Sequence, residues 1–171
     1  MKVRGRVWKY GDNVDTDVII PARYLTMTEE ADLGRHCFED LDAEFVSKVQ
    51  PGDIVLAGNL FGCGSSREHA PIAIKAAGCS AVVARSFARI YLRNSVNVGL
   101  PPVECPSIYD ETETGDVLEF DLAEGIVINT RTGAIHTSAT YPQFMLDILD
   151  AGGLVPYTRE KLAREASRAD G

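Results

Sequence analysis

The side chains best suited to chemistry in this sequence lie in residues 62–71, GCGSSREHAP. Two serines and an arginine follow a pair of glycines, between a short apolar run and a segment with helical patterning. In a loop of this kind, backbone N–H groups and the positive end of a helix dipole converge on an anion. Glycines let a ligand approach the backbone, and a guanidinium binds a carboxylate through two hydrogen bonds. The stretch therefore indicates a carboxylate site in which one serine takes part in the reaction.

Three well-known glycine-rich motifs do not match this stretch. The dinucleotide fingerprint needs a glycine where Arg67 stands, the P-loop needs a Gly-Lys-Ser/Thr sequence, and the nucleophile elbow needs glycines on both sides of its serine. Plainer interpretations also remain. Ser65 or Ser66 could cap the helix that follows. Arg67 could pair with Glu68 at the surface, and His69 could be a hydrogen-bonded structural residue.

The elements that must position this loop are short and alternate in type. Apolar runs at residues 53–57 and 80–84 are typical of strands buried on both faces. Helices are predicted at residues 67–77, with Pro71 in the first turn, and at residues 87–94. This alternation predicts parallel strands joined by a right-handed crossover.

The C-terminal half follows a different pattern. Residues 118–122 and 126–128 alternate apolar with polar side chains, and a third short run surrounds Ile135, as in an antiparallel meander. An amphipathic helix is predicted at residues 142–149. The expected fold class is therefore α/β, with a parallel β-α-β middle and an antiparallel C-terminal meander.

Other segments give weaker signals. Residues 1–10 alternate loosely, residues 32–49 have apolar side chains at helical spacing, and residues 24–30 lack either period. We expect one domain over residues 1–156, followed by a charged helix or tail over residues 157–171.

Composition limits the function classes. The chain has 171 residues, of which 45% are hydrophobic and 25% charged, so it can bury a core. Its 17 Lys and Arg against 25 Asp and Glu give a net charge of -8, and we expect neither nucleic acid nor an anionic membrane as partner. No apolar segment of a signal peptide or membrane span is present in the sequence, so we expect a cytoplasmic protein.

We predict no metal site in this chain. Asp12, Asp15 and Asp17 lack the spacing of a calcium loop and indicate Asx turns instead. The four cysteines stand far apart without a C-x-x-C pair, which favours reduced, mostly buried thiols over a disulfide framework or a zinc site. His36 and His136 have no partner that the sequence identifies.

Three segments in the same order resemble the small-subunit family of 3-isopropylmalate dehydratases in the aconitase superfamily. They are GDNVDTDVIIPARYL at residues 11–25, GCGSSREHAP at residues 62–71 and SFARIYLRN at residues 86–94. The resemblance extends from Val3 to about Pro156. It implies a swivelling β/β/α domain, and an enzyme of leucine biosynthesis that interconverts 2-isopropylmalate and 3-isopropylmalate by dehydration and rehydration.

The same resemblance implies a partner and a cofactor. In the family, the large subunit carries a 4Fe-4S cluster on three cysteines, whose iron assists the departure of hydroxide as a Lewis acid. This sequence has no such cysteine set. The small subunit would therefore be active only in a heterodimer or heterotetramer with the cluster-bearing large subunit, acting on a small dicarboxylic acid.

The resemblance also implies roles for individual residues. Ser65 would be the general base that removes the proton next to a carboxylate, and Ser66 and Arg67 would bind substrate carboxylate. A serine hydroxyl is a very weak acid, so its role as a base requires stabilisation by backbone N–H groups and nearby cations.

Specificity in the family resides in the loop after the Pro-x-Arg-Tyr-Leu motif, here Leu25, Thr26, Met27 and Thr28. Homoaconitase-type subunits have an arginine where Thr26 stands, and without it a distal carboxylate lacks a bidentate partner. Leu25 and Met27 could instead pack an isopropyl group. This favours isopropylmalate, with homoaconitase-type or citramalate- and dimethylmalate-type activity as alternatives. A loop without periodicity could also become ordered when substrate binds.

Two interpretations from other classes remain. One is a non-catalytic assembly or RNA-binding module, against which the acidic composition argues. The other is a stand-alone hydrolase with Ser65 as nucleophile, for which the sequence offers no plausible base, although only geometry can exclude His69. Asn59 and Leu60 depart from the family pattern, and the sequence assigns them no role.

Overall fold

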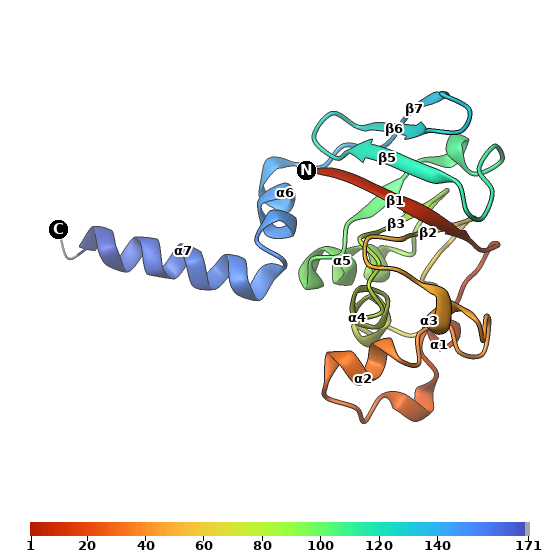
Figure 1. Ribbon diagram of the computed structural model, residues 1–171. Helices are drawn as coiled ribbons and strands as arrows, with labels where there is room; N and C mark the ends of the chain where they lie inside the picture. The colour runs from red at the N-terminus through yellow and green to blue at the C-terminus, as the bar shows by residue number, and fades with distance from the viewer. Residues whose placement is uncertain (170–171) are drawn as a thin grey trace.

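A seven-stranded mixed sheet forms the centre of the computed structural model, which describes residues 1–169 (Figure 1). Its strands are β1 (Lys2–Lys9), β2 (Ile54–Ala57), β3 (Ala81–Ala84), β4 (Pro102–Glu104), β5 (Val117–Asp121), β6 (Ile126–Asn129) and β7 (Ile135–Thr137). Their order in the sheet is β4-β3-β2-β1-β5-β6-β7. The helices are α1 (Thr16–Ile19), α2 (Glu30–Gly34), α3 (Phe45–Lys48), α4 (His69–Ala76), α5 (Arg89–Val98), α6 (Gln143–Asp150) and α7 (Leu154–Ala169), with 3-10 turns η1 (Ala22–Tyr24) and η2 (Pro106–Ile108).

Strand β1 joins the two halves of the sheet. Its C-terminal residues pair in parallel with β2, and its N-terminal residues pair antiparallel with β5. Strands β2, β3 and β4 are parallel neighbours, whereas β5, β6 and β7 are antiparallel neighbours. The predicted parallel middle and antiparallel meander are therefore confirmed. The loose alternation of residues 1–10 did not indicate that this strand pairs with both the parallel and the antiparallel half of the sheet.

Strands β2 and β3 are continuously apolar because both of their faces are buried. Along β2, Val55 and Ala57 point into one apolar core, whereas Ile54 and Leu56 point into a second core on the opposite face. Helices α2 and α4 pack together on the first side. The second core is completed by β5, β6 and α6.

Two predicted helices begin later than their patterns indicate. Helix α4 begins at His69, so neither Ser65 nor Ser66 caps it, and Glu68 precedes it without a capping side-chain hydrogen bond. Helix α5 begins at Arg89 and continues to Val98, where Gly99 ends it in a left-handed conformation. The predicted helix at residues 142–149 is confirmed by α6.

Residues 32–49 do not form one helix. The N–H of Phe38 donates to the carbonyl of Ile19 at 2.8 Å, and Phe38 has a φ of 58°, which no helix accommodates. Phe38 and Phe45 are nevertheless both buried, while Leu41 is exposed. The apolar spacing therefore indicated burial at Phe38 and Phe45 but not at Leu41, and the helical structure of this region is limited to the short helices α2 and α3.

The C-terminal segment forms the single helix α7, which extends away from the sheet in Figure 1. The helix begins at Leu154, two residues before the predicted end of the domain at residue 156. Residues 170–171 lie outside the part of the chain that the structure describes. The division into a domain and a charged tail stays a prediction. Among residues 1–169, no helix has the length and apolar character needed to cross a membrane.

Candidate active site

The glycine-rich loop lies alongside the segment that precedes α1. Gly62 donates its N–H to the carbonyl of Val14 at 2.8 Å, and Thr16 donates its N–H to the carbonyl of Cys63 at 2.9 Å. The hydroxyl of Thr16 also donates to the carbonyl of Ser65 at 3.0 Å. Residues 14–16 and 62–65 therefore run side by side. Two motifs about 50 residues apart in sequence form one surface.

Gly62 and Gly64 are required by this close packing. Both have positive φ, of 77° and 89°. A Cβ at Gly62 would lie 2.1 Å from Cγ of Tyr91, and a Cβ at Gly64 would lie 2.3 Å from a carboxylate oxygen of Asp15. Any side chain at either position would therefore displace the loop from its neighbours.

A cavity of about 310 Å³ adjoins the loop and brings all three motifs together. Ser65, Ser66 and Arg67 line it from the glycine-rich loop, and Thr16 lines it from the first motif. The third motif contributes residues of α5 and the residue before it. These are Ala88, Arg89, Ile90, Tyr91 and Asn94.

The loop offers hydrogen-bond donors to a ligand in this cavity. Within residues 1–169, the backbone N–H groups of residues 64–68 have no hydrogen-bond acceptor, and neither do the hydroxyls of Ser65 and Ser66. Both serines are exposed. Free N–H groups next to the N-terminus of α4 suit an anion and stabilise developing negative charge on oxygen. The anion-binding property expected from the sequence therefore has a structural basis.

Arg67 is held by an acidic residue that the sequence reasoning missed. Its guanidinium forms an ion pair with Asp17 rather than with Glu68. The Arg67 side chain is only 15% exposed, whereas that of Asp17 is 53% exposed. The N–H of Asp17 donates to Asp15 at 2.7 Å, which is the predicted Asx turn. Asp17 therefore both belongs to that turn and orients the arginine of the cavity.

Asn59 and Leu60 have structural roles. Asn59 donates its N–H and its amide group to one oxygen of Asp12, at 2.6 and 3.2 Å. Leu60 has a φ of 55° and donates its N–H to the hydroxyl of Ser86 at 2.9 Å. Both residues thus fasten the loop after β2 to its neighbours. Among the described residues, no group of three His, Cys, Asp or Glu side chains could hold a metal ion.

Leu25, Thr26 and Met27 do not line this cavity. They follow η1, with Thr26 exposed and Leu25 and Met27 half-buried. Met27 packs partly against the first apolar core. The structure therefore brings the three predicted residues of the glycine-rich loop together, but it does not bring the predicted specificity residues to the same cavity.

Cys63 lies inside the loop but is a poor nucleophile. Burial, followed by the nearby charge of Asp15, raises the pKa of its thiol. The thiol is therefore protonated at neutral pH. His69 is half-buried and forms no hydrogen bond with Ser65 in the part of the chain that the structure describes. This geometry does not favour a hydrolase that uses Ser65 and His69.

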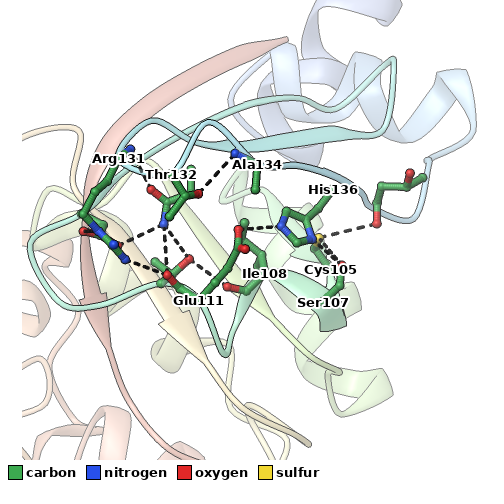
Figure 2. Close-up of polar contacts among 12 residues, drawn as sticks. Cys105, Ser107, Ile108, Glu111, Arg131, Thr132, Ala134 and His136 are labelled. Carbon is green, nitrogen blue, oxygen red and sulfur yellow. Dashed lines mark hydrogen bonds and ion pairs between the residues drawn. The ribbon is translucent and has the colours of Figure 1, made fainter.

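A second polar cluster contains residue types that also occur in hydrolases (Figure 2). His136 on β7 lies between Ser107 and Glu111, with its Nδ1 2.8 Å from the serine Oγ and its Nε2 2.6 Å from a carboxylate oxygen. Nearby, Arg131 donates to the carbonyl of Glu111 at 2.8 Å and pairs with Asp116 at 2.7 Å. We interpret this cluster as structural, because it joins β7 and the turn before it to η2 and the turn after it, and none of its residues lines the cavity beside Ser65.

Comparisons with known proteins agree with this arrangement. The family model described as the aconitase C-terminal domain matches residues 22–107. The 3-isopropylmalate dehydratase small subunit of Thermodesulfovibrio yellowstonii is 53% identical over 96% of this chain and 98% of its own length. That of Aquifex aeolicus is 55% identical over 95% and 98%.

Two matches from Methanocaldococcus jannaschii are also similar. The isopropylmalate/citramalate isomerase small subunit of Methanocaldococcus jannaschii is 51% identical over 94% of this chain and 96% of its own length. A crystal structure of 3-isopropylmalate dehydratase from the same organism superposes with a TM-score of 0.92 and 43% identity, covering 98% of this chain and 99% of that one.

Proposed function

This chain belongs to the family of 3-isopropylmalate dehydratase small subunits, and we propose that its cavity beside residues 62–67 binds a carboxylate of isopropylmalate. In this proposal Ser65 removes a proton from the carbon next to that carboxylate. The chain is the small subunit of a hydro-lyase of leucine biosynthesis, which interconverts 2-isopropylmalate and 3-isopropylmalate. The observation that carries the site proposal is the convergence of all three motifs on one cavity.

Ser65 is the proposed general base. Its oxygen removes a proton from the carbon next to a carboxylate, the electron pair left behind forms a carbon–carbon double bond, and hydroxide leaves from the neighbouring carbon. Addition of water in the opposite orientation moves the hydroxyl group. The free N–H groups of residues 64–68 and the guanidinium of Arg67 support this role, because they stabilise negative charge on the serine oxygen and on the substrate.

Ser66 and Arg67 are the proposed carboxylate ligands. Arg67 is mostly buried and is oriented by Asp17, so its guanidinium is preorganised before substrate arrives. Ser66 is exposed next to it and adds a hydroxyl donor. Together they hold the carboxylate that activates the neighbouring C–H bond.

A 4Fe-4S cluster is implied by the family, and the residues described here do not fit one. Cys37, Cys79 and Cys105 are at most 4% exposed, and only Cys63 reaches the cavity loop. We propose that a cluster-bearing large subunit completes the active site, as the name small subunit of the relatives implies. The stoichiometry would be a heterodimer or a heterotetramer, and the complex would act in the cytoplasm.

The proposed substrate side group is apolar. Leu25 and Met27 are half-buried at the start of the predicted specificity loop, and Thr26 offers no charge for a distal carboxylate. Citramalate is the second candidate, because one relative of 51% identity is named an isopropylmalate/citramalate isomerase small subunit.

The experiment is anaerobic reconstitution with the large subunit encoded nearest to this chain. Turnover would be followed by alkene absorbance with isopropylmalate, citramalate and homocitrate in parallel. We expect a preference for isopropylmalate, and a loss of at least about 10²-fold in kcat for Ser65→Ala. Ser107→Ala, at another exposed serine, is the matched control and should keep its rate.

Three results would contradict parts of this proposal. A Ser65→Ala complex that assembles by gel filtration and keeps a near-wild-type rate would overturn the base assignment. Preference for homocitrate would show that another cation holds the distal carboxylate. Inactivity on all three substrates, together with salt-dependent RNA binding, would favour the non-catalytic module.

A further inference from the structure

Five residues form a polar cluster at the base of the predicted specificity loop, which comprises residues 25–28. We call this cluster the loop clamp. It consists of Arg23, Tyr24, His36, Glu39 and Asp40. Arg23 and Tyr24 belong to η1, directly before the loop, and the other three follow α2. The clamp therefore joins the two ends of the segment that contains the loop.

Arg23 binds two carboxylates at once. Its Nη2 lies 2.8 Å from Oε1 of Glu39. Its Nη1 and Nη2 also donate to the two oxygens of Asp40, at 2.9 and 2.6 Å. A bidentate pair of this kind fixes the orientation of the guanidinium, which a single surface ion pair does not.

Tyr24 and His36 close the clamp. Their rings are stacked, with centroids 3.8 Å apart and an interplanar angle of 12°. The hydroxyl of Tyr24 donates to Oε1 of Glu39 at 2.7 Å, and Nδ1 of His36 lies 2.5 Å from Oε2 of the same carboxylate. Glu39 thus has partners on both oxygens. Hydrogen bonds from His36, Arg23 and Tyr24, in that order, lower the pKa of Glu39 to about 2, so it is ionised at neutral pH.

The backbone of the loop depends on the clamp. Met27 donates its N–H to the carbonyl of Tyr24 at 3.0 Å, and Leu25 donates its N–H to the carbonyl of Ala22 at 3.2 Å. Both acceptors lie in η1, which contains Arg23 and Tyr24. A displacement of Tyr24 would therefore move the backbone of Met27 with it.

We propose that Arg23, Tyr24, His36, Glu39 and Asp40 are positioning residues that hold residues 25–28 in place and thereby set the selectivity of the enzyme for the side group of its substrate. This inference rests on the proposed function of the loop. None of the five residues lines the cavity beside Ser65. Their connection to the loop is the hydrogen bond from the N–H of Met27 to the carbonyl of Tyr24.

The first test needs only the isolated chain. Glu39→Gln keeps the size of the side chain and removes the charge that three partners share. We expect amide hydrogen exchange at Leu25 and Met27 to become at least about 10-fold faster in this variant, because a hydrogen bond to a charged group is a strong one. Asp32→Asn is the matched control, since it removes an exposed ion pair with Arg35 in the same segment and should leave exchange unchanged. Unchanged exchange in Glu39→Gln would overturn the clamp.

The second test uses the complex with the large subunit. Glu39→Gln should raise KM for isopropylmalate about 10-fold with kcat within about 3-fold of wild type, and should reduce the preference for isopropylmalate over citramalate. Arg23→Met should show the same loss of preference for isopropylmalate, and Arg23→Lys, which keeps the positive charge, should lose less of it. If the wild-type complex is active and Glu39→Gln leaves its selectivity unchanged, the proposed role of the loop clamp is wrong and the proposed function stands. A wild-type complex inactive on isopropylmalate would instead overturn the proposed function.

Discussion

The substitution Gly64→Ala tests whether the packing of the glycine-rich loop supports the site. Gly64 has a φ of 89°, and a left-handed conformation costs an alanine about 1–2 kcal/mol. The new Cβ would also lie 2.3 Å from one oxygen of Asp15 and 2.6 Å from its Cγ. Forcing such a contact apart costs about 1–3 kcal/mol. We therefore expect Gly64→Ala to lower the free energy of unfolding by about 2–5 kcal/mol.

Gly133→Ala separates these two effects. Gly133 has a φ of 72°, and nothing lies within 4 Å of the position that its Cβ would take. This variant should therefore show only the conformational cost of about 1–2 kcal/mol. Urea unfolding of the isolated chain measures both variants, and the difference between them gives the cost of displacing Asp15.

Activity provides the second part of the test. Displacement of Asp15 would move the turn that places Asp17, and with it the partner of Arg67. We expect kcat/KM to fall more than 10-fold for Gly64→Ala and to stay within about 2-fold of wild type for Gly133→Ala. If Gly64→Ala were no less stable than Gly133→Ala, or equally active, the argument that the loop is positioned against Asp15 would be wrong.

Three further predictions concern separate residues. Asp17→Asn leaves the mostly buried Arg67 without its ionised partner, so kcat/KM should fall about 10-fold, and steady-state kinetics of the reconstituted complex would detect the loss. Hydrogen bonds from Arg6, the Gln50 N–H and the Trp8 indole lower the pKa of Asp53 despite burial. The stabilisation from its charge is therefore present above about pH 4 and lost as the pH falls below it, and the difference in unfolding free energy between wild type and Asp53→Asn should shrink there. Ser107→Ala should cost about 0.5–1.5 kcal/mol in urea unfolding, because its hydrogen bond with His136 is lost.

Local chemistry explains why part of the fold and site could be predicted. Continuous apolar runs identify β2 and β3, because strands buried on both faces need no alternation of apolar and polar residues. The glycine pair before a predicted helix likewise indicates a loop whose backbone N–H groups are free to bind an anion. The start of α4 was predicted two residues early, since nothing local shows that the loop continues through Glu68.

Long-range pairing explains what the sequence could not predict. Arg67 has both Glu68 beside it in sequence and Asp17 fifty residues away, and only the fold decides between them. The decisive step is the run of backbone hydrogen bonds between residues 14–16 and 62–65, which brings the Asx turn against the loop. An aspartate that sequence reasoning assigned to a turn is therefore also the residue that orients the arginine of the site. His36 is a second case, because the sequence identified no partner for it and the fold stacks its ring on that of Tyr24. A side chain that the local pattern explains completely can thus have a second role, as Asp17 does here when it pairs with Arg67.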